Sequence, residues 1–222
     1  MNFWEQHLNQ IREQLLMMSG LTERNFAMAM RALMERDDKL ANAVEADDTE
    51  IDQLEVHIDE MVVTFVSTHG AVAKDTRFIL TASKISSNLE RIADEATTIA
   101  RRARELNTEP LLHPLIEIPA MADLAREMLR DSITAFIEGN PQLAVEIVAR
   151  DRTVDSINRQ VARELTCTMI DNPKAITRAL NLMTIAKAIE RIADHATNIA
   201  EEVHYLLRGE DIRHDQTLKG SA

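Results

Sequence analysis

A short segment near the middle of the chain returns near its end, and this repeat constrains the fold more than any other feature of the sequence. The residues ERIAD at 90–94 recur at 190–194, and ten of the sixteen positions from 85 to 100 are identical one hundred places later. Further upstream the matching offset is 103, which aligns Val44 with Ile147. Self-similarity over this length predicts that the chain folds as two copies of one structural unit.

Each copy carries the hydrophobic pattern of amphipathic helices. Apolar residues recur three and four places apart around both ERIAD segments, as expected when one face of a helix is buried. The 222 residues include only five glycines and five prolines, and aromatic residues make up 3%, a composition typical of long helices. We therefore predict an all-α fold with six helices over 3–36, 38–68, 74–106, 115–138, 141–171 and 174–208.

Capping residues and prolines divide this pattern into two units. Asp37 and Asn140 occupy equivalent positions, and each is expected to cap the N-terminus of a helix. A cluster of prolines at 110, 114 and 119 is expected to form the main linker, because proline interrupts helices. The predicted arrangement is two tandem three-helix bundles over 1–108 and 109–209, followed by a polar tail over 210–222.

Three features inside the predicted helices suggest how they pack. Gly20 lies within the first helix, where it is expected to kink the helix or to let a neighbour approach closely. Cys167 lies on a stretch with the apolar residues Leu165 and Met169 and is expected to be a packed thiol. The methionines at 17, 18, 28, 30 and 34 are expected to fill the core, with adaptable partner binding as the alternative.

The charge balance limits the possible functions of the protein, and its cysteine content and N-terminal residues indicate where it is located. There are 37 acidic and 25 basic side chains, which gives a formal net charge of −12. This excess argues against direct nucleic acid binding, because there is no excess of basic side chains to release counterions from phosphates. The single cysteine cannot form an internal disulfide, and the N-terminal residues do not resemble a secretory signal. We therefore expect a cytoplasmic protein.

Four acidic residues in the first copy have the spacing of a shared site. Asp48 and Asp52 are about one helical turn apart, and so are Glu90 and Asp94, so each pair shares a helix face. Counting from Gly70 at the predicted turn, Asp52 lies 18 residues before it and Glu90 lies 20 after it. Since each helical residue rises about 1.5 Å, antiparallel helices place these two acids at nearly the same height.

The second copy repeats this registration around Asn172, with Asp155 17 residues before it and Glu190 18 after it. Facing carboxylates repel one another unless solvent, protons or a cation neutralises them. Oxygen-rich clusters suit hard or borderline metals, here Mg, Mn, Fe or Zn in a divalent or trivalent state, although a merely solvated acidic stripe is the alternative. The candidate metal ligands are Asp48, Asp52, Glu90, Asp94, Asp151, Asp155, Glu190 and Asp194, with Asn198 as a weaker addition.

The sequence contains no Gly-rich phosphate loop, no GxSxG elbow and no HExxH motif. No catalytic residue is therefore assigned. His195 adjoins Asp194 but points about 100° away around the helix, so it is expected to be a surface or interface residue instead of a metal ligand.

The two repeated segments resemble a known family. SKISSNLERIADEA at 83–96 and IERIADHATNIAE at 189–201 resemble the paired LERIGDHAxNIAE segments of the PhoU family, phosphate-signalling accessory proteins of bacteria. The residues MSGL at 18–21 resemble the family's MGxL, and the resemblance covers the whole chain. Ala93 and Ala193 replace the family's usual glycine, and DTR at 75–77 replaces its DLR. Neither change removes a carboxylate.

The resemblance implies a cytoplasmic, usually homodimeric, non-enzymatic regulator. Such a protein would couple the phosphate transporter, through its ATPase subunit PstB, to the sensor kinase PhoR and its response regulator PhoB. It would keep the phosphate-starvation (Pho) regulon off when phosphate is plentiful. The resemblance also implies that E(D)xxxD motifs hold iron or zinc, and these motifs match the eight acids named above.

Two other functions remain as alternatives. A carboxylate di-iron enzyme would need a Glu-x-x-His pair in a four-helix core, but Ala93 and Ala193 stand three residues after Glu90 and Glu190. A purely structural helical spacer would share a continuous helix between its units, and the prolines of the linker argue against such a helix.

Overall fold

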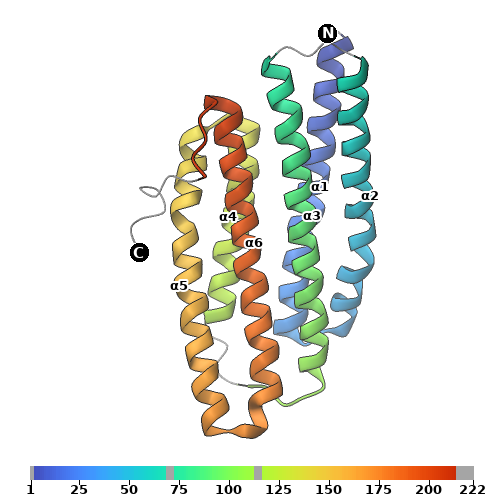
Figure 1. Ribbon diagram of the computed structural model, residues 1–222. Helices are drawn as coiled ribbons and strands as arrows, with labels where there is room; N and C mark the ends of the chain where they lie inside the picture. The colour runs from blue at the N-terminus through green and yellow to red at the C-terminus, as the bar shows by residue number, and fades with distance from the viewer. Residues whose placement is uncertain (1–2, 69–72, 113–116, 214–222) are drawn as a thin grey trace.

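Two sets of three helices make up the fold of the computed structural model, which describes residues 3–68, 73–112 and 117–213 (Figure 1). The first set comprises α1 (Phe3–Glu35), α2 (Asp38–Thr68) and α3 (Ala73–Asn107). The second set comprises α4 (Glu117–Glu138), α5 (Pro141–Asp171) and α6 (Ile176–Arg208), with a 3₁₀ turn, η1 (Pro173–Ala175), before α6. Within these described ranges there is no strand. The predicted all-α fold of two three-helix bundles is confirmed.

The observed helix bounds lie within two residues of the predicted ones. The largest difference is at the start of α6, and the predicted start of the fourth helix at 115 lies outside the described residues. The segment before α6 forms the 3₁₀ turn, in which the Lys174 amide donates to Oδ1 of Asn172 at 3.2 Å. Asp37 and Asn140 cap their helices as predicted: Oδ1 of Asp37 accepts from Lys39 N at 2.8 Å, and Asn140 accepts from two amides of α5.

The two bundles lie side by side, with α3 and α6 in contact between them (Figure 1). A second, smaller contact joins α1 to α4. This arrangement is not that of an end-to-end spacer. The predicted polar tail returns along the bundle as far as it is described, because Ile212 is buried; residues 214–222 lie outside the described part of the chain.

The repeated apolar stripe forms the core of each bundle. Ile85, Ile92 and Ile99 are 0% exposed, and so are their equivalents one hundred places later in α6. Each such side chain contributes about 1.5–3 kcal/mol on burial. The duplicated pattern of the sequence is therefore a duplicated core.

Two expectations about packing are wrong. Beyond the neighbouring residues and backbone of its own helix, nothing lies within 4 Å of a Cβ built on Gly20, so this glycine does not mediate a close approach, and α1 continues through it. Cys167 is exposed, because it lies about 200° around α5 from the buried Leu165. The methionines of α1 are divided between core and surface: Met18 is fully buried, whereas Met17 and Met34 are about half exposed.

An arginine takes the place of a glycine at the first helix-helix turn. Arg36 adopts a left-handed backbone (φ 57°), as does its repeat equivalent Gly139 (φ 64°), and this conformation is costly for a residue with a Cβ. The Arg36 guanidinium donates to the carbonyls of Leu106, Asn107 and Glu109 at 3.3, 2.6 and 2.8 Å. It thereby closes the C-terminal end of α3, where unpaired carbonyls would otherwise remain.

We expect Arg36→Ala to lower the free energy of unfolding by about 2 kcal/mol, because the carbonyls lose a charged donor while the strained backbone remains. Arg36→Gly should cost roughly 1 kcal/mol less, since glycine accepts the left-handed conformation. Urea denaturation of both variants tests this, and equal losses would contradict it.

Candidate functional site

The structure brings the predicted acids of each bundle together on one face. We call Asp48, Asp52, Glu90 and Asp94 the first seam, between α2 and α3. The equivalent second seam, between α5 and α6, consists of Asp151, Asp155, Glu190 and Asp194. The negative charges of Asp52 and Asp94 raise the pKa of the Asp48 carboxyl, and they also raise the pKa of the Glu90 carboxyl. In the second seam, the negative charges of the other three acids raise the pKa of Asp194. The predicted registration therefore holds in both bundles.

Crowding and burial make several of these carboxyls hard to ionise. Partial burial raises the pKa of Glu90 to about 7, and Asp94 adds to this effect. Partial burial and then Asp151 raise the pKa of Asp194 to about 6. The pKa of Asp48 is raised by burial and then by Asp52. Carboxyls shifted in this way favour a proton or a cation close to them.

Different basic residues reach the two seams. In the first seam Arg91 pairs with Oε2 of Glu90 at 3.2 Å and with Oδ2 of Asp94 at 3.3 Å. Its repeat equivalent, Arg191, instead crosses to α3 and pairs with Glu95 at 3.1 Å. This crossing is possible because Glu95 is acidic, whereas the equivalent position in α6 holds a histidine.

Lys187 and Arg159 reach the second seam instead. Lys187 pairs with Glu190, and Arg159 lies 4.0 Å from Asp155. The ERIAD sequence is therefore repeated, but its electrostatic partners are not.

Sequence reasoning missed a threonine at each seam. Thr197 donates from Oγ1 to Oδ1 of Asp151 at 3.3 Å. Its equivalent, Thr97, is 3% exposed and lies beside Asp48, where its hydroxyl favours the ionised carboxylate. The sequence contains a signal for this role, because the threonine is identical in the two repeats and lies three residues after Asp94 or Asp194.

Glu55 is a further acid that sequence reasoning missed. Burial raises the pKa of Glu55 most. The negative charge of Asp59 raises it further, and that of Asp52 also contributes. It lies three residues after Asp52, and therefore on the same side of α2. The first seam thus extends farther along its helices than the predicted four acids.

The donors suit a metal ion in chemistry but do not converge on one point. Among the described residues, no group of three or more His, Cys, Asp or Glu side chains is close enough together to hold a metal ion. Oδ1 of Asp48 is nevertheless buried, and no described group makes a hydrogen bond to it. Carboxylate oxygens are suitable ligands for hard cations. Asp52 and Asp94 are exposed, so packing does not hold their side chains in a single position.

Asn198 and His195 lie at the contact between α3 and α6. Nδ2 of Asn198 donates to Oδ1 of Asn88 at 3.4 Å, and Nδ1 of His195 lies 2.9 Å from the same oxygen. Burial lowers the pKa of His195, and Arg91 lowers it further. His195 is thus an interface residue, as expected. The amide of Asn198 is directed toward α3, and a ligand role for this residue stays a prediction.

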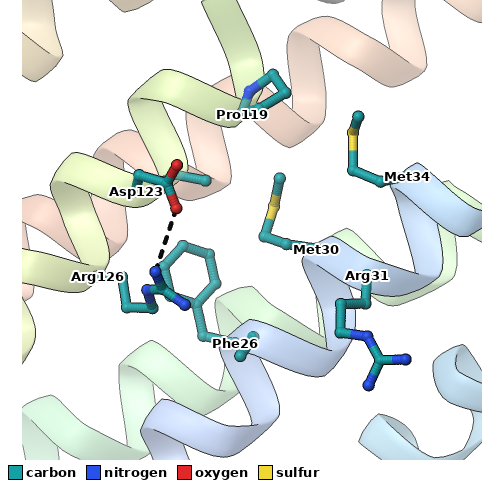
Figure 2. Close-up of a pocket in the computed structure, with 9 residues that line it drawn as sticks. Phe26, Met30, Arg31, Met34, Pro119, Asp123 and Arg126 are labelled. Carbon is teal, nitrogen blue, oxygen red and sulfur yellow. Dashed lines mark hydrogen bonds and ion pairs between the residues drawn. The ribbon is translucent and has the colours of Figure 1, made fainter.

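A groove separates the bundles on the side where α1 approaches α4 (Figure 2). Its volume is about 210 Å³. Phe26, Met30 and Met34 contribute its wall on α1, and Pro119 contributes to the wall on α4. Arg126 pairs with Asp123 at 3.4 Å at its edge. The methionines of α1 therefore present an apolar surface as well as filling the core.

The raised pKa of Glu90 predicts how stability depends on pH. The folded protein binds this proton more tightly than the unfolded chain, so the contribution is complete below about pH 4.5 and is lost as pH rises through about 7. In metal-free protein, Glu90→Gln should therefore raise the free energy of unfolding at pH 8 by about 1 kcal/mol, allowing for solvent screening. At pH 4 the variant should match the parent.

Denaturation at both pH values measures this effect, and Glu60→Gln, on an exposed part of α2, is the control. A stabilisation by Glu90→Gln that did not change with pH would contradict the assignment.

Comparisons with known proteins identify the family. The PhoU domain matches residues 15–103 and again 118–203. A phosphate-specific transport system accessory protein PhoU homolog from Pseudomonas putida is 40% identical over 208 residues, which cover 93% of this chain and 81% of the relative. The Aquifex aeolicus homolog is 38% identical, covering 93% and 94% of the two chains.

Solved structures agree with these relatives. The crystal structure of PhoU from Pseudomonas aeruginosa aligns with a TM-score of 0.91 at 37% identity, covering 93% of this chain and all of the other. The phosphate transport system regulatory protein PhoU from Streptococcus pneumoniae aligns with a TM-score of 0.87 at 25% identity, covering 93% and 98%. None of the helices, as far as they are described, has the length and apolar character needed to cross a membrane. The chain belongs to the PhoU family.

Proposed function

We propose that this protein is a regulatory adaptor of the phosphate transport system that keeps the Pho regulon off when phosphate is plentiful. The observation that carries this proposal is the PhoU domain match in both halves of the chain, together with the fold match over 93% of it. Relatives with this fold are named as accessory or regulatory proteins of phosphate transport. The partners would be the ATPase subunit PstB and the kinase PhoR or its response regulator PhoB, at the cytoplasmic side.

An adaptor needs a rigid body with accessible surfaces. The side-by-side bundles supply the rigid body, because α3 and α6 are joined by a cluster of polar contacts in addition to apolar packing. Lys84 pairs with Glu202 at 2.8 Å, and Glu95 pairs with Arg191. The groove between α1 and α4 and the two acidic seams are surfaces on which partner proteins or a second copy in a homodimer could act.

The seams would add cation binding to this function. Metal held by the carboxylates would neutralise like charges that the fold forces together, and a hard divalent cation suits their oxygen donors. A di-iron enzyme is disfavoured by the residues present, because alanine occupies the position where such a centre needs histidine. The relatives' names also describe accessory proteins.

Deletion of the gene tests the regulatory proposal. Phosphate-scavenging genes should be expressed at high phosphate in the deletion strain, and the wild-type gene should restore repression. Transcript levels measure this, and unchanged repression in the deletion strain would count against the proposal.

Elemental analysis tests the metal proposal separately. Protein purified without chelator should contain iron, zinc, manganese or magnesium, and the Asp94→Ala/Asp194→Ala variant should lose it because each seam loses an acid. The exposed Asp123→Ala is a control outside both seams. Equal metal content in all three proteins would show that the seams do not bind it.

A further inference from the structure

The chain turns back on itself after α6 (Figure 1). Gly209, the C-cap of this helix, adopts a left-handed backbone (φ 74°), which glycine accepts without strain. Residues 209–213, which we call the strap, then run back along the second bundle. The side chain of Ile212 is 8% exposed, and Nδ1 of His204 lies 3.3 Å from the carbonyl oxygen of Glu210. Burial and this polar contact therefore dock the strap onto the bundle.

The last residue of the strap lies beside a buried acid that the first bundle also uses. Glu202 in α6 is 7% exposed. Nζ of Lys84 in α3 pairs with Oε1 of Glu202 at 2.8 Å, and Nη1 of Arg213 lies 3.6 Å from the same oxygen. Two positively charged side chains, one from each bundle, thus share one carboxylate. Because a buried carboxylate is costly without a charged partner, Glu202 needs at least one of the two.

Arg213 is placed to approach Glu202 more closely. Its guanidinium is held by Asp211, whose Oδ1 accepts from Nε of Arg213 at 2.9 Å. The Arg213 side chain is 46% exposed, so packing does not fix its position. A cavity of about 300 Å³ lies between α3 and α6, and Lys84, Glu202 and Arg213 are among the residues that line it. The guanidinium therefore has room to move onto the carboxylate, and Lys84 has room to leave it.

This pairing lies far from the covalent connection between the bundles. Lys84 lies about 35 Å along α3 from the end of that helix at Asn107, since each helical residue rises about 1.5 Å. The linker follows Asn107, and there Arg178 of α6 donates to the carbonyl of Pro110 at 3.0 Å. A rotation of the bundles about the linker would therefore separate them most at the level of the pairing.

We propose that Lys84 and Arg213 are alternative partners of Glu202, and that the strap thereby controls how firmly the two bundles are joined at this end. With Lys84 on Glu202, α3 and α6 are held together. When Arg213 takes its place, the acid stays paired, and α3 can move away without leaving a buried charge unpaired. Such a movement would change the relative position of α1 and α4, and with it the surface that an adaptor presents.

A double-mutant cycle in the full-length protein tests the shared acid. Lys84→Met and Arg213→Met each leave one partner on Glu202, so each should raise the equilibrium constant of unfolding less than about fivefold. The combined variant leaves Glu202 buried and unpaired. Its increase should exceed the product of the two single increases at least about tenfold. Adding Glu202→Gln should remove this excess, because a neutral amide does not need a charged partner.

Urea denaturation at pH 7 measures these constants. The matched control combines Lys84→Met with Arg208→Met, because Arg208 is an exposed arginine directly before the strap. The effects of these two substitutions should multiply without excess.

Spin labels test the movement itself. Glu60→Cys on α2 and Gln142→Cys on α5 place labels at exposed positions in the two bundles, and Cys167→Ser removes the native exposed thiol. Double electron–electron resonance should give longer distances for Lys84→Met than for the parent. Arg213→Met should leave the distances unchanged, because Lys84 still holds the acid. Circular dichroism verifies that each variant retains its helices.

Each of the following results would overturn the proposal. They are single effects of Lys84→Met and Arg213→Met that simply multiply, an excess that persists with Glu202→Gln, unchanged distances in Lys84→Met, or longer distances in Arg213→Met. The last result would make the strap a clamp instead of a substitute partner. Gene repression is a separate measurement, so a failure here with intact repression would refute the exchange of partners and leave the regulatory function standing.

Discussion

Burial of the repeated apolar stripe is the constraint on which the rest of the structure depends. The isoleucines at 85, 92 and 99 of α3 and their equivalents in α6 pack into the two bundle cores and are inaccessible to solvent. Once these residues face inward, the rotation of each helix is fixed. The acids one position away are then directed toward the neighbouring helix. The hydrophobic effect thereby holds like charges together that would separate in a free helix.

The repeat also shows how two copies of one unit can diverge without a change of fold. The alignment pairs Glu95 with His195 and Ser87 with Lys187. The first difference redirects Arg191 from its own seam to Glu95 across the interface. The second supplies Lys187 as a partner for Glu190. These two substitutions, one at the contact between α3 and α6 and one at an exposed position, give the two seams different charged partners.

The fold was largely predictable because its signals are local and repeated. Helix caps such as Asp37, the spacing of the apolar stripe and the position of Asn172 between α5 and α6 fix lengths and register by helix geometry alone. The same helix geometry predicted that the acids of neighbouring helices face one another. The division of the protein into domains at 108 stays a prediction.

Features that depend on contacts between helices could not be read from spacing. The left-handed Arg36, the direction of Asn198 toward α3 and the exposure of Cys167 depend on which neighbour each side chain meets. The sequence shows that Thr97 has a hydroxyl and Glu55 a carboxyl that can take part in the seam. Their roles depend on burial at the seam, which the sequence does not show.

The most direct test of the central claim is a carbon NMR titration of the Glu90 side-chain carboxyl in metal-free protein. The account predicts that this group titrates with a pKa of about 7, because the fold holds it partly buried beside Asp94. A pKa near the ordinary value of 4.5 would show that the facing acids are independent and solvated, and would contradict the account.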